Sequence, residues 1–408
     1  MEERDSGLDR RSFLKIAGAA SAAAGVGAAP ALAGHWLPPD PNRPPGHFGD
    51  GGQADEGDVP QPTSLPQVPW PTIKTEHDRG DAIITRYQGN LDATDFGCAG
   101  DHRTGLVYVS QRFTDHIAVF DREREEFGAL WNIPTQGSGA HAIKVDAASN
   151  SVWFSGGEGA RVGRLVLHPQ TLRPHNFVEY SPPGDVRTER KPHGLLVLGD
   201  EVWYTDDRGD RTGWVDVATG FIGLIREDDG SEAHIESDGI NVETATGRRR
   251  VWVGGGNQVT VIDAKSKRIE HRVTIPEEPG FTQLRVHDIH YEPQRKRVYV
   301  LLRGSDHVVW FDARDPEAGP QEFINPGRTA AGLDHVDLGT RYLWWTEGLA
   351  NNVTRYDLET GEVRPYQVPN PAGYFNPHGI WVSPEWREVW FTEREALCRL
   401  RFKTGGPV

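Results

Sequence analysis

Cysteine is scarce in this chain, which has only Cys98 and Cys398 among its 408 residues. A scaffold held together by several disulfides is therefore excluded. No Cys-x-x-Cys-His sequence is present, so covalent attachment of a c-type haem is excluded as well. The two cysteines lie near opposite ends of a repeat region, and the sequence leaves open whether they form a single bridge.

Positive charge and long apolar runs are also in short supply. The chain has 44 lysines and arginines against 59 acidic residues, a formal charge of −15. This balance argues against nucleic acid or an anionic membrane surface as the main partner. Beyond the N-terminal stretch no segment is apolar over a length that could span a bilayer. We therefore expect a monomer that has no transmembrane domain and no nucleic-acid partner.

The N-terminal segment, residues 1–33, has the pattern of a twin-arginine export signal. Arg10 and Arg11 precede a short, mildly apolar stretch that ends in the small-x-small sequence Ala31-Leu32-Ala33. This predicts export of the folded protein to the periplasm or the cell exterior, so that a metal could be loaded first. Residues 34–75 are crowded with proline, glycine and acids, which predicts a disordered linker. The folded body is expected over residues 76–408.

A repeat occupies most of that body. Its units begin at Phe96, His141, His193, Asp238, His287, His335 and His378, with spacings of 45, 52, 45, 49, 48 and 43 residues. This period is typical of one propeller blade. Each unit contains strand-like runs separated by turn residues, and the 3.6-residue periodicity of helices is missing. The sequence predicts an all-β fold, a seven-bladed β-propeller of four-stranded blades.

The ends of the body predict how the ring closes. The seventh unit, which ends in "ALCRLRFKTGGPV", supplies a third strand and no fourth. Residues 81–89, "DAIITRYQG", precede the first unit and alternate as an outer strand does. We expect this N-terminal strand to complete the last blade and so to remove a free sheet edge.

Histidine recurs at the start of the units, at the mouth of the central channel. The first strand of a propeller blade is innermost, so the repeated position forms a ring of Phe96, His141, His193, Asp238, His287, His335 and His378. Converging imidazoles near carboxylates offer metal ligands and a base that works near neutral pH. The alternative is that these side chains only join neighbouring blades. Glu347, Glu393 and Glu395 follow second strands and are candidates for the same mouth. The tryptophans of the second strands are expected to pack between blades.

The unit pattern resembles the virginiamycin B (streptogramin B) lyases. The stretches that carry the resemblance are "KPHGLLVLGDEVWYTDD", "LWWTEGLANNVTRYD" and "NPHGIWVSPEWREVWFTE". That family consists of seven-bladed propellers that open a cyclic ester by Mg²⁺-dependent elimination. The resemblance implies catalytic roles for His378 and His335. It places Asn376 where the family has a metal-binding glutamate, Phe96 where it has a tyrosine, and Glu393 or Glu395 near its second metal ligand.

Three functions therefore stay open on the sequence. The first is an exported lyase of this type that acts on a cyclic ester with Mg²⁺. The second is a non-catalytic propeller that binds a protein, glycan or peptide in the cell envelope. The third is a histidine-ringed hydrolase or oxidase that depends on another metal. Each function places a small-molecule or peptide ligand at the channel mouth.

Overall fold

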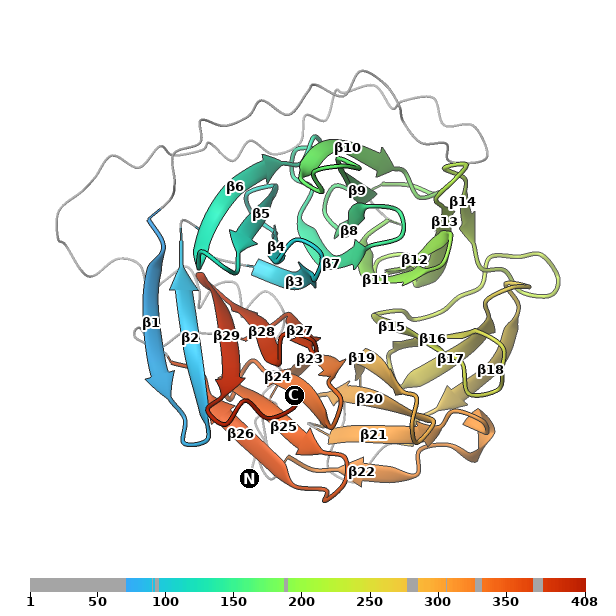
Figure 1. Cartoon of the computed structure of the whole chain (residues 1–408). Helices are drawn as coiled ribbons and strands as arrows, with labels where there is room; N and C mark the ends of the chain where they lie inside the picture. The colour runs from blue at the N-terminus through green and yellow to red at the C-terminus, as the bar shows by residue number, and fades with distance from the viewer. Residues whose placement is uncertain are drawn as a thin grey trace, which may run out of the picture. The chain divides into compact units, whose positions relative to one another are not determined.

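The protein folds as a seven-bladed β-propeller, as the sequence predicts (Figure 1). The structure, a computed structural model, describes residues 71–89, 91, 95–186, 190–276, 285–305, 307–326, 332–369 and 377–408, without the side chains of residues 95 and 96. The blades are arranged in a ring, and the first strand of each blade lies innermost, around the central axis (Figure 1). No helix in these ranges is long and apolar enough to cross a membrane.

The first four blades follow one another along the chain, each an antiparallel sheet of four strands. From the channel outward, they consist of β3 (Asp95–Asp101), β4 (Leu106–Gln111), β5 (His116–Asp121) and β6 (Glu126–Asn132); β7 (Ala140–Asp146), β8 (Ser151–Gly156), β9 (Arg161–Leu167) and β10 (Pro174–Tyr180); β11 (Pro192–Leu198), β12 (Glu201–Asp206), β13 (Arg211–Asp216) and β14 (Ile222–Leu224); and β15 (Gly239–Glu243), β16 (Arg250–Gly255), β17 (Gln258–Asp263) and β18 (Ile269–Thr274).

The last three blades continue the pattern, with one 3₁₀ turn between two strands of blade five. They consist of β19 (Arg285–Glu292), β20 (Arg297–Arg303), β21 (His307–Asp312), η1 (Pro316–Ala318) and β22 (Glu322–Ile324); β23 (Leu333–Leu338), β24 (Tyr342–Glu347), β25 (Asn352–Asp357) and β26 (Val363–Gln367); and β27 (Ile380–Ser383), β28 (Glu388–Glu393) and β29 (Ala396–Phe402), to which β2 (Ala82–Gln88) and β1 (Ile73–Asp78) are added.

The hydrophobic core consists of separate clusters that lie between neighbouring blades. The buried apolar residues of the described chain form seven clusters, and each cluster joins two neighbouring blades. The second strands are buried along their whole length in several blades because both faces of the sheet are covered. The predicted packing of the second-strand tryptophans is confirmed for Trp153, Trp203, Trp252, Trp344 and Trp390, all at most 1% exposed. Burying such large side chains supplies much of the hydrophobic stabilisation.

Blade seven closes the ring in the way the sequence predicts. Strand β2 pairs with β29, from Ala82 opposite Phe402 to Gln88 opposite Ala396. The structure adds a fifth strand that the sequence reading missed, because β1 pairs along the outside of β2. Residues 73–75, assigned to the predicted linker, therefore belong to the propeller. The predicted export signal (1–33) and the linker up to residue 70 lie outside the described residues and stay predictions.

Candidate metal centre at the channel mouth

The innermost strands begin with a repeated local structure that aims side chains at the channel. In blade two the pairing register shifts between Ala140 and Ile143, which leaves His141 and Ala142 in a β-bulge. The second residue after the ring position is buried in every blade; these residues are Cys98, Ile143, Leu195, Ile240, Ile289, Val336 and Ile380. The bulge therefore separates a channel-facing side chain from an apolar side chain that anchors the strand.

In blade six the ring position lies one residue earlier than predicted. The register of this blade shifts between Leu333 and Val336, so that Asp334 and His335 form the bulge. Asp334, not His335, occupies the position equivalent to His141. The ring is thus Phe96, His141, His193, Asp238, His287, Asp334 and His378, and the side chain of Phe96 lies outside the described residues. His335 projects from the next position along the same bulge.

A hydroxyl group from the second strand fixes the ring backbone. Ser155 accepts a hydrogen bond from the Ala142 amide (2.9 Å) and donates one to the His193 carbonyl oxygen of the next blade (2.6 Å). Hydroxyl donors in three other blades reach the carbonyl oxygen of the next ring residue in the same way; they are Ser110, Thr205 and Thr346. Part of the blade-joining role expected as an alternative therefore falls to these hydroxyl groups and to the ring backbone.

Two blades depart from this pattern at the position that follows the ring residue. Five blades have glycine or alanine there, whereas blade five has Asp288 and blade six has His335. In blade four this position requires a small residue, since a Cβ on Gly239 would lie 2.5 Å from the Asp288 Cα atom. Asp288 Oδ2 lies 3.2 Å from His335 Nδ1 and accepts a hydrogen bond from the Val336 amide at 3.0 Å. The two larger side chains therefore pair with each other across the blade boundary.

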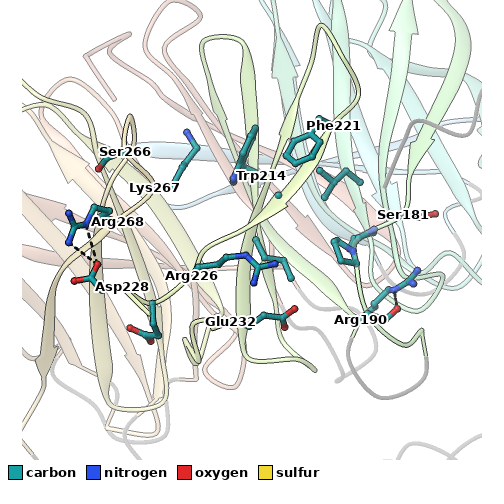
Figure 2. Close-up of a pocket in the computed structure, with 17 residues that line it drawn as sticks. Ser181, Arg190, Trp214, Phe221, Arg226, Asp228, Glu232, Ser266, Lys267 and Arg268 are labelled. Carbon is teal, nitrogen blue, oxygen red and sulfur yellow. Dashed lines mark hydrogen bonds and ion pairs between the residues drawn. The ribbon is translucent and has the colours of Figure 1, made fainter. Parts of the chain in front are cut away.

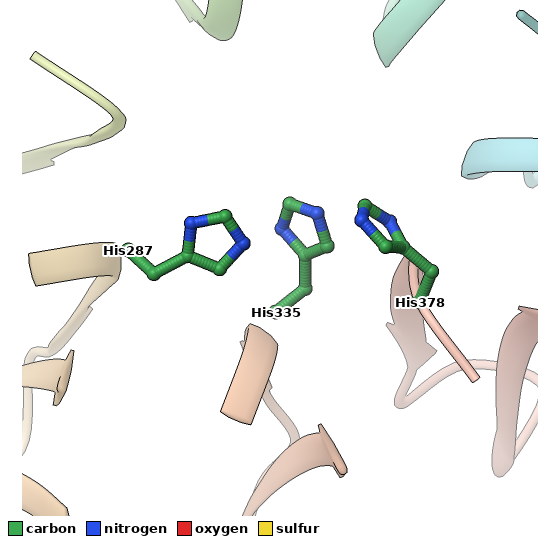
Figure 3. Close-up of side chains that lie close together, drawn as sticks. All are labelled: His287, His335 and His378. Atoms are coloured by element: carbon green, nitrogen blue, oxygen red, sulfur yellow. The ribbon is translucent and has the colours of Figure 1, made fainter. Parts of the chain in front are cut away.

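Three imidazoles converge beside this pair, from blades five, six and seven (Figure 3). One ring nitrogen from each of His287, His335 and His378 lies within 4.8 Å of the other two. The ring centroids of His335 and His378 are 4.6 Å apart, and those of His287 and His335 are 5.4 Å apart. Nε2 of His335 is buried and has no hydrogen-bond partner among the described residues. A buried, unpartnered imidazole nitrogen facing two others is the arrangement of a metal site.

Asp238 holds two of the ring histidines. Its carboxylate oxygens lie 2.9 Å from His193 Nδ1 and 3.0 Å from His287 Nδ1. Burial works against a charged imidazole, but the carboxylates of Asp238 and Asp334 outweigh it and raise the pKa of His287 to about 9. Burial likewise opposes ionisation of Asp238, yet the two imidazoles hold its pKa well below the usual range. The Nδ1 contact leaves Nε2 of His287 facing the channel.

Asp334 adds a carboxylate to the three imidazoles. Its side chain is 1% exposed, and Oδ1 lies 3.4 Å from His287 Nε2 and 3.2 Å from Arg303 Nη2. Burial would favour the neutral acid, but the contact with His287 and the nearby cations lower the pKa of Asp334. Neither oxygen makes a hydrogen bond of good geometry with the described residues. Asp334 is therefore an ionised oxygen donor next to the histidines.

The opposite side of the ring carries a close pair of imidazoles. The rings of His141 and His193 have centroids 3.9 Å apart, and the ring centroids of His141 and His378 are 5.6 Å apart. Burial, followed by the neighbouring imidazole of His193, holds the pKa of His141 well below its ordinary value. The neutral form of His141 is therefore favoured at neutral pH.

Two of the glutamates predicted for the site make hydrogen bonds within their blades. Glu347 is fully buried in blade six, where Trp345, Thr354 and Asn352 donate hydrogen bonds to it. These contacts account for both of its carboxylate oxygens within blade six.

The two candidates in blade seven lie at the end of β28 and in the turn that follows it. Glu393 is fully buried and bonded to the guanidinium of Arg86 on β2, so it ties the closing strand to β28. Burial raises the pKa of Glu393, and Arg86 opposes that rise. Glu395 is half-buried in the β28–β29 turn. Asn376 lies outside the described residues.

Sequence reasoning missed the acidic and basic residues around the ring. They are Arg285, Asp288, Arg303 and Asp334, together with Lys191 beside Asp207. One signal could have found Asp334: aligning units by the buried apolar residue, Val336 with Ile289 and Ile380, places Asp334 in the ring. No repeat could reveal Asp288 or Arg285, because each occurs in one blade only.

A second hollow, of about 930 Å³, lies between blades three and four at the outer strand β14 (Figure 2). Several of its charges are paired within the protein. Arg268 contacts Asp228 at 2.8 Å, and Lys267 contacts Glu201 at 2.7 Å. Lys267 also rests on the ring of Trp214. The hollow contains no ring residue, and the channel mouth is the better candidate for chemistry.

Comparison of this chain with protein-family models and with curated proteins finds no match. The fold and the geometry of the channel mouth therefore carry the functional argument.

Proposed function

We propose that this protein is a metal-dependent hydrolase that acts at the channel mouth on a substrate with an ester or a related carbonyl group. The ion would be held by His287, His335 and His378, with Asp334 as an oxygen donor. The observation that carries the proposal is the buried Nε2 of His335, which lacks a partner and faces two further imidazoles. A buried polar atom without a partner costs free energy, about 1–3 kcal/mol, unless another group satisfies it.

The donor set indicates which ion fits. Imidazole nitrogens suit zinc, iron, copper and nickel, whereas magnesium prefers carboxylate, carbonyl and water oxygens. The predicted magnesium ligand Glu393 is bonded to Arg86 inside blade seven. The described donors do not fit Mg²⁺, and no step is assigned to it. A transition-metal ion in this place supplies a Lewis acid that polarises a carbonyl oxygen.

The surrounding residues have separate tasks. Asp288 contacts Nδ1 of His335 and Asp238 contacts Nδ1 of His287, which selects the tautomer with a free Nε2 lone pair and holds each ring in place. His141 lies next to His378, so its imidazole could act as a base toward a water molecule at the mouth. Asp334 is a buried acid whose Oδ1 lies 3.4 Å from Nε2 of His287, so its charge would stabilise a cation there.

The second candidate is elimination of the virginiamycin B lyase type. Two observations favour it: the unit pattern resembles that family, and His141 lies beside His378, where an imidazole could remove a carbon-bound proton. An oxidase is favoured only if the native ion is iron or copper. A non-catalytic propeller in the cell envelope remains the alternative without turnover.

Product mass separates these functions. The full chain, loaded with zinc, iron or copper, is incubated with aryl esters and with a cyclic depsipeptide of the streptogramin B type. A product heavier than its substrate by one water supports the hydrolase, and a ring-opened product of unchanged mass supports the lyase. His378→Ala should abolish turnover with little change in melting temperature. Absence of turnover with every ion and substrate would favour the binding protein.

We also propose that the folded protein is exported by the twin-arginine pathway, on the strength of Arg10, Arg11 and the Ala31-Leu32-Ala33 sequence. Replacing both arginines with lysine should leave the protein in the cytoplasm, as fractionation would show. Unchanged export of that variant would contradict the proposal.

A further inference from the structure

Two arginines stand at the channel mouth on blade five, next to the three histidines. Arg285 and Arg303 are directly opposite each other in the β19–β20 pairing, and Arg285 is two residues before His287. Like charges directly opposite in a sheet repel each other. Anions close to such a pair offset this repulsion.

Carboxylates of the protein already contact one nitrogen of each of these two arginines. Arg303 Nη2 contacts Asp334 at 3.2 Å, and Arg285 Nη2 contacts Asp207 at 2.7 Å and Asp238 at 3.0 Å. Among the described residues, no other hydrogen bond or ion pair involves either guanidinium. The side chains of Arg303 and Arg285 are 48% and 38% exposed, so a ligand can reach them. Each guanidinium has five N–H donors in a planar fork that matches a carboxylate.

Fixed charges of both signs lie around the site. The carboxylates include Asp207, Asp238, Asp288 and Asp334, and the cations include Lys191, Arg285 and Arg303. A planar carboxylate matches the fork of an arginine guanidinium, so a ligand with such a group fits the two arginines.

We infer that the substrate carries a carboxylate group, which Arg303 and Arg285 bind beside the metal centre. This inference deepens the proposed function and rests on it. The carboxylate would place the reacting carbonyl against the ion and His141, so the arginines would act as positioning residues. Binding through a planar fork also explains why arginine, and not lysine, stands at both positions.

Calorimetric titration of the metal-loaded full chain with benzoate, benzamide and inorganic phosphate tests the inference. Benzoate should bind more tightly than benzamide or phosphate. Arg303→Gln and Arg285→Gln should each weaken benzoate binding about tenfold or more, since a hydrogen bond to a charged group contributes at least that much. Arg303→Lys keeps the positive charge but loses the planar fork of donors. Its affinity for benzoate should lie between those of the unmodified protein and of Arg303→Gln. Arg341→Gln is the matched control, because Arg341 is 37% exposed and pairs with Asp357 at the far end of blade six.

Several outcomes would overturn the inference. These are unchanged benzoate affinity in the Arg303 and Arg285 variants, equal affinity for benzamide, or tighter binding of phosphate. Metal content is measured on the same samples. A protein that holds no ion but binds benzoate through Arg303 would refute the metal-dependent function and keep the carboxylate site. A protein that holds its ion and binds benzoate independently of both arginines would refute the carboxylate site alone.

Discussion

Asp288 of blade five contacts His335 of blade six through a 3.2 Å approach of Oδ2 to Nδ1. Both residues stand where the other five blades have glycine or alanine. The two substitutions depend on each other, because the carboxylate fixes the imidazole that the bulge directs into the channel. The pair has the arrangement of a metal-ligating histidine supported by an outer carboxylate.

Asp288→Asn should weaken metal binding. The amide cannot supply the negative charge that supports His335, and loss of such a partner lowers metal affinity about 10- to 100-fold. Competition with a chelator of known affinity measures the change. Asp337→Asn is the control, because Asp337 accepts a comparable bond from the Val382 amide (2.7 Å) and touches none of the three histidines. Equal effects of the two substitutions would indicate a purely structural role for Asp288.

Glu393→Gln should destabilise the fold and leave the metal content unchanged. The substitution removes the partner of the buried Arg86 guanidinium, and breaking a buried ion pair costs about 3–5 kcal/mol. Urea unfolding and elemental analysis of the same sample measure both effects. Glu395→Gln, in the neighbouring turn, should change neither. If Glu393→Gln loses its metal at unchanged stability, the oxygen-based site expected from the sequence is the correct one.

Acid should loosen the contact between blade one and the closing strands. Burial disfavours the charge on Glu125, but Lys74, Arg399 and Tyr87 donate hydrogen bonds to it and lower its pKa from 4.5 to about 2. A lowered folded-state pKa stabilises the fold above pH 4.5, and this contribution is lost as the pH falls from 4.5 through 2.

Urea unfolding at a series of pH values tests this link. Stability of the unmodified protein should decline more steeply below pH 4.5 than that of Glu125→Gln, which has no carboxylate to protonate. Identical pH profiles would show that Glu125 does not contribute to closure.

Removal of residues 71–89 should expose the edge of β29 and reduce both cooperativity and solubility, because β2 and β1 cover that edge. Removal of residues 1–70 is the control and should leave the melting transition intact. Similar melting curves for the two truncated proteins would rule out a closing role for β1 and β2.

The fold could be predicted in most of its detail because every blade has the same pattern of strands and buried residues. Large apolar residues recur in the second strands at one period, and a strand before the first unit matches the one missing from the last. Strand β1 could not be predicted, since its exposed sequence "IKTEHD" has no apolar face.

The site was predicted less well, because it lies where the repeat is broken. His287, His335 and His378 were recognisable as repeated residues. The equivalence of Asp334 with the ring depends on a β-bulge that shifts the register by one residue. Glu347 and Glu393 have the spacing of site residues, but their neighbours Trp345 and Arg86 bind them within the blades.

The metal content of the full chain tests the central claim most directly. Elemental analysis of protein purified without chelators should find about one transition-metal ion per chain, and His335→Ala should lose it while the melting temperature of its metal-free form stays close to that of the metal-free unmodified protein. Glu347→Gln should retain the ion. An unmodified protein without bound transition metal, or a His335→Ala variant with the same metal content, would contradict the account.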